Sequence, residues 1–135
     1  MELKVLLSGR WRILSPISKG AQSITEEFLD GLAASFQSNT AGLLVMMEQH
    51  SEHGPEQFNT AQCHYVDQRE QIYEYIKGRL RLFWFEDDDR VVVCMHGIVK
   101  KDQKTPRRDI DRAKRVKATY MQAKAEGSLT FIEEE

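Results

Sequence analysis

The spacing of hydrophobic positions changes halfway along the chain, from the period of helices to the period of strands. Between about Thr25 and Gln37, apolar residues recur at helical spacing, which predicts an amphipathic helix. A break at residues 38–40 separates it from a second helix, predicted from about Ala41 to His50. Because the link is short, the two helices should form an antiparallel hairpin. A short strand from Arg10 to Leu14 precedes them, followed by a turn-rich connector at residues 15–20.

The second half alternates between apolar and polar residues, as strands do. Residues 71–77 and 79–85 form two such segments, and the acidic residues 86–89 predict a hairpin loop after the second. The loop leads into a third strand, Val91 to Val99, whose two alternating faces are both apolar up to His96. This third strand should therefore lie in the middle of the sheet, with both of its faces covered.

The last helix should begin at Thr105-Pro106, because threonine is a good N-cap and proline suits the first helical position. The order of elements predicts one α+β domain over residues 1–135. In it, an N-terminal strand and a helical hairpin pack on a small antiparallel sheet, and a basic helix follows at the C-terminus. Residues 128–135 should form a loose tail.

Charge is distributed unevenly along the chain. The segment from Lys100 to Lys124 holds ten Lys or Arg residues against three Asp, a net charge of +7, whereas the whole chain has −2. A basic pole on an acidic body is typical of proteins with polyanionic partners. The alternative is a solvated helix face, which is the commoner origin of a charge run.

Composition also bears on compartment and cofactors. The chain contains no run of about 20 apolar residues, the length that a membrane span requires, and its start lacks a signal-peptide layout. We therefore expect a cytoplasmic protein with no membrane partner. Cys63 and Cys94, the only cysteines, are more typical of a reducing compartment than of a disulfide bridge. Neither has the spacing of structural zinc ligands, so we expect no metal and no cofactor.

One continuous stretch, from Arg79 to Tyr120, joins several recognisable features: RLRLFWFEDDDRVVVCMHGIVKKDQKTPRRDIDRAKRVKATY. A strand with two arginines is followed by an acidic turn and an apolar strand that ends in His96-Gly97. A Lys-Lys pair and a Lys-Thr-Pro then start a helix. This arrangement resembles phage-derived proteins of the RelE/HigB toxin superfamily. It departs from them at Ile98, a position that is usually aromatic.

The resemblance implies a RelE-like fold and a small toxin that cleaves messenger RNA, often on the ribosome. It also implies a cognate antitoxin, commonly a helix-turn-helix protein. Catalytic residues differ among branches of the superfamily, so the resemblance assigns no acid–base pair. The fold therefore transfers better than the activity.

Cleavage of this kind makes the ribose 2′-oxygen attack the adjacent phosphate, which requires proton transfer and positive charge on the phosphorane, but no metal. Arg79 and Arg81 lie two positions apart on one predicted strand, so they should share a face and grip the phosphate. Lys101 and Lys104 lie where the third strand gives way to the last helix, a turn suited to phosphate. In both cases the alternative is an ordinary basic surface.

The histidines are candidates for the proton transfer, because histidine titrates near neutral pH. His96 is the first of them. It should lie on the face of Val92 and Cys94, however, where a hydrogen-bonded core histidine is the more common arrangement. The weaker candidates are His50, His53 and His64.

The hypothesis from the sequence is thus a metal-independent endoribonuclease toxin whose partners are messenger RNA, the ribosome and an antitoxin. The residues expected to hold the RNA backbone are Lys100, Arg107, Arg108, Arg112, Arg115 and Lys117. One alternative is a non-catalytic RNA- or ribosome-binding phage-related protein on the same scaffold. Another is a phage structural or adaptor protein whose basic helix binds an acidic protein surface.

Overall fold

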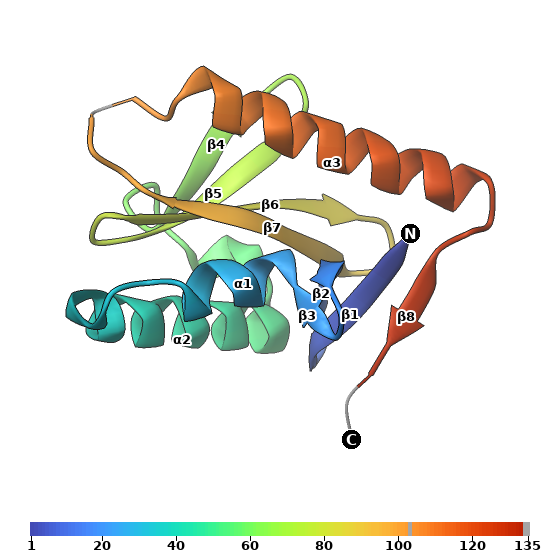
Figure 1. The fold of residues 1–135 in the computed structure, drawn as a ribbon, viewed down its shortest axis with the longest axis horizontal. Helices are drawn as coiled ribbons and strands as arrows, with labels where there is room; N and C mark the ends of the chain where they lie inside the picture. Colours follow the sequence, from blue (N-terminus) through green and yellow to red (C-terminus); the bar gives the residue numbers. More distant parts are fainter. Residues whose placement is uncertain (103, 134–135) are drawn as a thin grey trace.

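The fold is built on one mixed β-sheet that is covered by helices on both faces (Figure 1). The computed structural model describes residues 1–102 and 104–133. The strands follow the order β4-β5-β6-β7-β2-β1-β8, and β3 pairs with β2 beside this path. They are β1 Glu2–Ser8, β2 Arg12–Lys19, β3 Gln22–Ser23, β4 Cys63–Asp67, β5 Ile72–Lys77, β6 Leu80–Asp87, β7 Val91–Val99 and β8 Thr130–Ile132. The helices are α1 Ile24–Asp30, α2 Gln37–His53 and α3 Arg107–Ala125, with 3₁₀ turns at Ala34–Phe36 and Pro55–Gln57.

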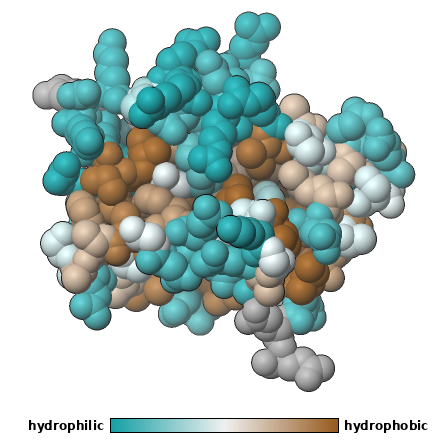
Figure 2. Space-filling model, viewed as in Figure 1, coloured by the Kyte–Doolittle hydropathy of each residue, from teal (hydrophilic) through white to brown (hydrophobic). Residues whose placement is uncertain are grey.

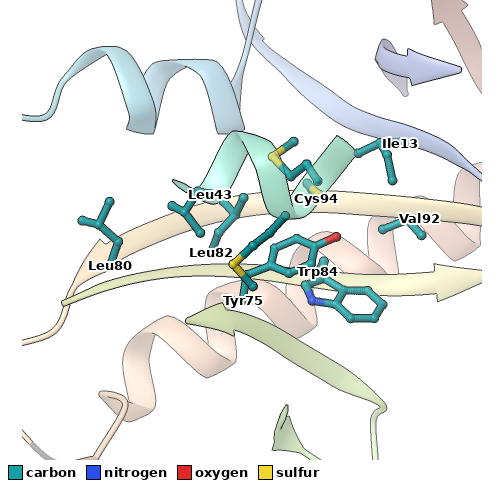
Figure 3. Close-up of a cluster of buried hydrophobic side chains, with 10 residues drawn as sticks. Ile13, Leu43, Tyr75, Leu80, Leu82, Trp84, Val92 and Cys94 are labelled. Atoms are coloured by element: carbon teal, nitrogen blue, oxygen red, sulfur yellow. The ribbon is translucent and has the colours of Figure 1, made fainter. Parts of the chain in front are cut away.

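The two faces of the sheet bury separate hydrophobic clusters. Helices α1 and α2 cover one face, where Leu43 of α2 packs with Trp84 and Cys94 of the sheet (Figure 3). Helix α3 covers the other face, where Tyr120 packs with Phe85. Strand β7 contributes to both clusters. The α+β class is therefore confirmed, as is the central position of β7 with both faces covered.

The sheet is larger than predicted and is not wholly antiparallel. Strands β4 to β7 form an antiparallel meander, whose last three strands were predicted. Strand β7 then pairs in parallel with β2, through Arg12–Leu14 and Val91–Val93. Strand β1 escapes prediction because Lys4 interrupts its apolar pattern. This lysine is buried, and its Nζ lies 2.9 Å from the carboxylate of Glu26.

The predicted connector at residues 15–20 is wrong, because β2 continues as far as Lys19. Pro16 fits within this strand because the pairing of β2 with β7 ends at Leu14. The missing N–H of proline therefore breaks no bond to β7.

The helical hairpin is present, with boundaries that differ from the prediction. Helix α1 ends at Asp30, and the predicted break at residues 38–40 lies in the first turn of α2. Polar side chains are tolerated there because the first N–H groups of a helix have no helical partner. Helix α1 begins with a capping box, in which Ser23 and Glu26 each bond the other's backbone N–H. The two helices run in opposite directions in Figure 1.

Helix α3 begins one residue later than predicted. Pro106, rather than Thr105, occupies its N-cap position. The predicted loose tail at residues 128–135 is wrong for Thr130–Ile132, which pair in parallel with β1, while residues 134 and 135 lie outside the described part. Among the described residues, no helix is long and apolar enough to cross a membrane.

Candidate nucleic-acid interface

Three adjoining hollows surround the C-terminal end of β7 and its connection to α3. The first, of about 390 Å³, lies between α1 and α3, and Figure 2 shows hydrophobic atoms exposed there between two hydrophilic surfaces. The second and third have volumes of about 260 and 450 Å³. Val99 lines both the first and the second hollow, and Lys100 and Lys101 line both the second and the third. The three hollows are therefore neighbours that share lining residues.

Cations dominate the second and third hollows. We use the name basic rim for Arg79, Arg81, Lys100, Lys101 and Lys104, each of which lines one or both. Lys101 and Lys104 are exposed and Lys100 is half-buried. Within the described part of the chain, the side chains of these three lysines make no hydrogen bond or ion pair. They are thus available to an anion from outside the protein.

The two arginines of the basic rim reach the third hollow from different directions. Arg79 lies in the turn before β6, and its guanidinium lies 5.9 Å from the ring centroid of Phe36 on the α2 side of the sheet. Arg81 belongs to β6 and lies on the α3 side, where its Nε is 3.7 Å from Oε2 of Glu74. Its Nη1 also donates to the carbonyls of Gly78 and Leu80, at 2.8 and 2.9 Å. The prediction that the two arginines share one strand face is therefore wrong, although both line the same hollow.

His96 lies on the opposite face of the sheet from the one predicted, because β7 contains a β-bulge. Leu82 of β6 pairs with Gly97, but Trp84 pairs with Cys94, so β7 has one extra residue between these pairs. A bulge of this kind reverses the alternation of the residues that follow it. The ring of His96 consequently lies on the α3 side, near Phe83.

On that side His96 is a buried, hydrogen-bonded histidine, as the core interpretation predicted. It is 3% exposed, its ring centroid is 4.8 Å from that of Phe83, and its Nε2 is 3.2 Å from Oδ1 of Asp109. Burial lowers the pKa of His96 and the charge of Arg112 lowers it further, while Asp109 opposes both. His96 and Arg112 line the first hollow rather than the hollow that holds Arg79 and Arg81.

A buried carboxylate next to the basic rim was missed by the sequence analysis. Glu74 of β5 is 1% exposed and faces α3. Its Oε2 lies 2.6 Å from Nε2 of His64 on β4 and 3.7 Å from Nε of Arg81. Its Oε1 accepts a hydrogen bond of 3.2 Å from the hydroxyl of Thr105. Glu74 thus joins three elements that meet beside the third hollow.

Little in the amino-acid pattern indicated this cluster. Glu74 stands between Tyr73 and Tyr75 in an alternating segment, the pattern of a polar residue on a solvated face. The pattern could not show that α3 and its connection cover this face. Strand β4 was not predicted either, so nothing placed His64 beside Glu74.

The basic residues of α3 are only partly available. Arg107 and Arg108 each approach an aspartate of their own helix, at 3.4 and 3.8 Å, but both are exposed and such pairs are weak. Lys117 donates to a backbone carbonyl in the turn between β4 and β5. Arg112 and Arg115 are exposed and make no hydrogen bond or ion pair within the described chain. Arg108 lines the second hollow and Arg112 the first, so the start of α3 extends the cationic surface.

A comparison with known protein families matches the segment that carries the candidate site. The model of a family described as phage derived protein Gp49-like matches residues 27–118, about two thirds of the chain. The matched segment runs from α1 into α3 and contains the basic rim, His64 and Glu74. No curated protein matches the chain.

Proposed function

The chain belongs to the Gp49-like family of phage-derived proteins, and on this premise we propose that it is the toxin of a toxin–antitoxin pair with a RelE-like fold. Its activity would be metal-independent endonucleolytic cleavage of messenger RNA, on the ribosome. The order of elements from β2 to α3, with a helical hairpin on one face of an antiparallel meander, supports this assignment.

The observation that carries the proposal is that three lysines of the basic rim have side chains without a hydrogen bond or ion pair in the described part of the chain. They are Lys100, Lys101 and Lys104. Attack of a ribose 2′-oxygen on phosphorus concentrates negative charge on the phosphorane, and preorganised cations lower that barrier. Lys100 and Lys101 line the third hollow together with Arg81, so one phosphate there would meet ammonium and guanidinium groups at once. Arg112 and Arg115 of α3 would bind neighbouring phosphates, a contact that gives affinity without sequence preference.

A second candidate is a non-catalytic RNA- or ribosome-binding protein on the same scaffold. The observation that favours it is the attachment of Arg79 and Arg81 to backbone carbonyls, which occupies part of each guanidinium. Binding would then persist without cleavage. The helix-turn-helix antitoxin is part of the toxin proposal only.

Tightly controlled expression distinguishes the two functions. Induction of the wild type should arrest growth and generate new internal ends in messenger RNA. Lys101→Ala combined with Lys104→Ala should abolish both effects. Arg10→Ala combined with Lys19→Ala is the matched control, since it removes two exposed cations outside the basic rim. Normal growth and intact messenger RNA, with abundant folded wild-type protein, would exclude the ribonuclease.

A further inference from the structure

The basic rim supplies positive charge, but the proposed reaction also needs a group that accepts a proton from the 2′-hydroxyl. Protonated lysine and arginine side chains are donors, not acceptors. Neutral histidine is the usual acceptor in enzymes near neutral pH. The position of each histidine therefore decides which one can meet a substrate in the third hollow.

Three of the four histidines are unsuited by position. His50 is a fully buried residue of α2, on the other face of the sheet, and its Nδ1 is hydrogen-bonded to the hydroxyl of Tyr75. His53 lies in the last turn of α2. His96 is 3% exposed and lines the first hollow. His64 differs from all of them, because its side chain is 44% exposed and lies next to the basic rim.

The contacts of His64 orient its ring as a proton acceptor requires. Its Nε2 is 2.6 Å from Oε2 of Glu74, and because a carboxylate can only accept, the pair requires the tautomer in which Nε2–H donates. The neutral ring then presents the lone pair of Nδ1 on its other side. A carboxylate behind the imidazole fixes the tautomer and stabilises the imidazolium that forms after proton transfer.

Glu74 is held in place by two further side chains, those of Arg81 and Thr105. Arg81, which lines the hollow, contacts the same carboxylate oxygen as His64 does, so the two side chains lie next to each other. Thr105, on the connection that carries Lys101 and Lys104, donates to the other oxygen. A carboxylate is costly to bury without partners, and these contacts compensate for its burial.

We infer that His64 is the general base of the proposed ribonuclease and that Glu74 is its positioning residue; this inference rests on the function proposed above. His64 Nδ1 accepts the proton of the 2′-hydroxyl as the 2′-oxygen bonds to phosphorus. The bond from phosphorus to the 5′-oxygen breaks, and that oxygen takes a proton from water. The products are a 2′,3′-cyclic phosphate and a 5′-hydroxyl, and the imidazolium returns its proton to solvent. Arg81 and Lys101 hold the phosphate.

The test compares wild type, His64→Ala and the matched control His53→Ala, with cleavage measured on free RNA and on translated RNA. His64→Ala should lower the cleavage rate by about 10²–10⁴-fold, the usual contribution of a general base, and leave RNA affinity unchanged. The charged group in contact with His64 is Glu74, whose carboxylate is also contacted by Arg81 and Thr105. In the wild type, the cleavage rate should rise with pH as the general base loses its proton. In His64→Ala this rise should disappear. Added imidazole should restore part of the rate.

Glu74→Gln tests the positioning role. Loss of the negative charge disfavours the imidazolium, so the rising limb of the pH profile should move to lower pH, an effect that a purely structural residue would not produce. If His64→Ala cleaves like wild type with the same pH profile, the inference is wrong and the proposed function stands. If wild-type protein cleaves neither substrate, both are wrong. The His64 side chain is partly exposed, so His64→Ala should fold. It therefore tests the inference even if Glu74→Gln fails to fold.

Discussion

The ring of Phe28 on α1 lies so close to the backbone of Gly97 on β7 that a β-carbon at Gly97 would come within 2.3 Å of a ring carbon. Strand β2 has separated from β7 before this point, and α1 occupies the space beside the end of β7. The absence of a side chain at residue 97 therefore allows α1 to pack closely against β7, where the two elements line the first hollow.

Gly97→Ala should displace Phe28 and destabilise the protein by about 1–3 kcal/mol, the usual cost of an added group in a packed site. Urea denaturation of both proteins gives the difference. The same substitution in a Phe28→Ala background should cost less, because the ring that it meets has been removed. Equal costs in the two backgrounds would show that the Phe28 contact is not the origin of the effect.

The stability of the fold should depend on pH through His50. Burial lowers the pKa of His50 from 6.5 to about 4. The unfolded chain therefore binds a proton that the folded protein does not, and the free energy of unfolding falls as pH is lowered from 6.5 to about 4. His50→Gln should flatten this slope in urea titrations at several pH values. Part of the dependence of the free energy of unfolding on pH should remain in His50→Gln, because the pKa of His96 is also lowered. The control His53→Gln, at an exposed position, should behave as wild type.

RNA binding should be salt-sensitive, and the lysines of the basic rim should account for part of that sensitivity. For single-stranded RNA, each lost phosphate contact lowers the slope of log affinity against log salt by about 0.7. Lys101→Ala and Lys104→Ala should each produce a change of this size in binding titrations. Arg10→Ala should produce none, and a slope that is the same in all three variants would exclude the rim as the phosphate contact.

The two cysteines should resist alkylation in the folded protein. Both are free thiols, and burial raises the pKa of Cys63 and of Cys94 to about 12. The thiolate is the reactive form, so it is scarce at neutral pH. Mass spectrometry after iodoacetamide treatment should find both unmodified until urea unfolds the chain. Rapid modification of native Cys94 would contradict the burial of its side chain.

The sequence predicted what depends on local periodicity and composition. The central strand β7, the helical hairpin, the basic helix and the cluster of lysines after β7 all follow from patterns within short windows. The failures arise where distant contacts override such patterns. Lys4 sits in a buried strand because Glu26 neutralises it, and residues 38–40 join a helix because its first turn tolerates them.

The candidate site illustrates the same limit. The lysines of the basic rim were found because they lie within five positions of one another in the sequence. His96 was placed on the wrong face because a bulge has no signature in an apolar strand. Glu74 and His64 were missed because their meaning depends on pairing between two strands and on cover from the α3 connection, neither of which is a local property.

The parallel pairing of β2 with β7 also has consequences for the kinetics of folding. Partners such as Leu14 and Val93 are separated by more than half of the chain, whereas the hairpins of the meander join near neighbours. Closing the longer loop loses more entropy and is slower. We expect pulse-labelled hydrogen exchange to find β5 to β7 protected early and β2 late, so that β2 joins a meander that has already formed.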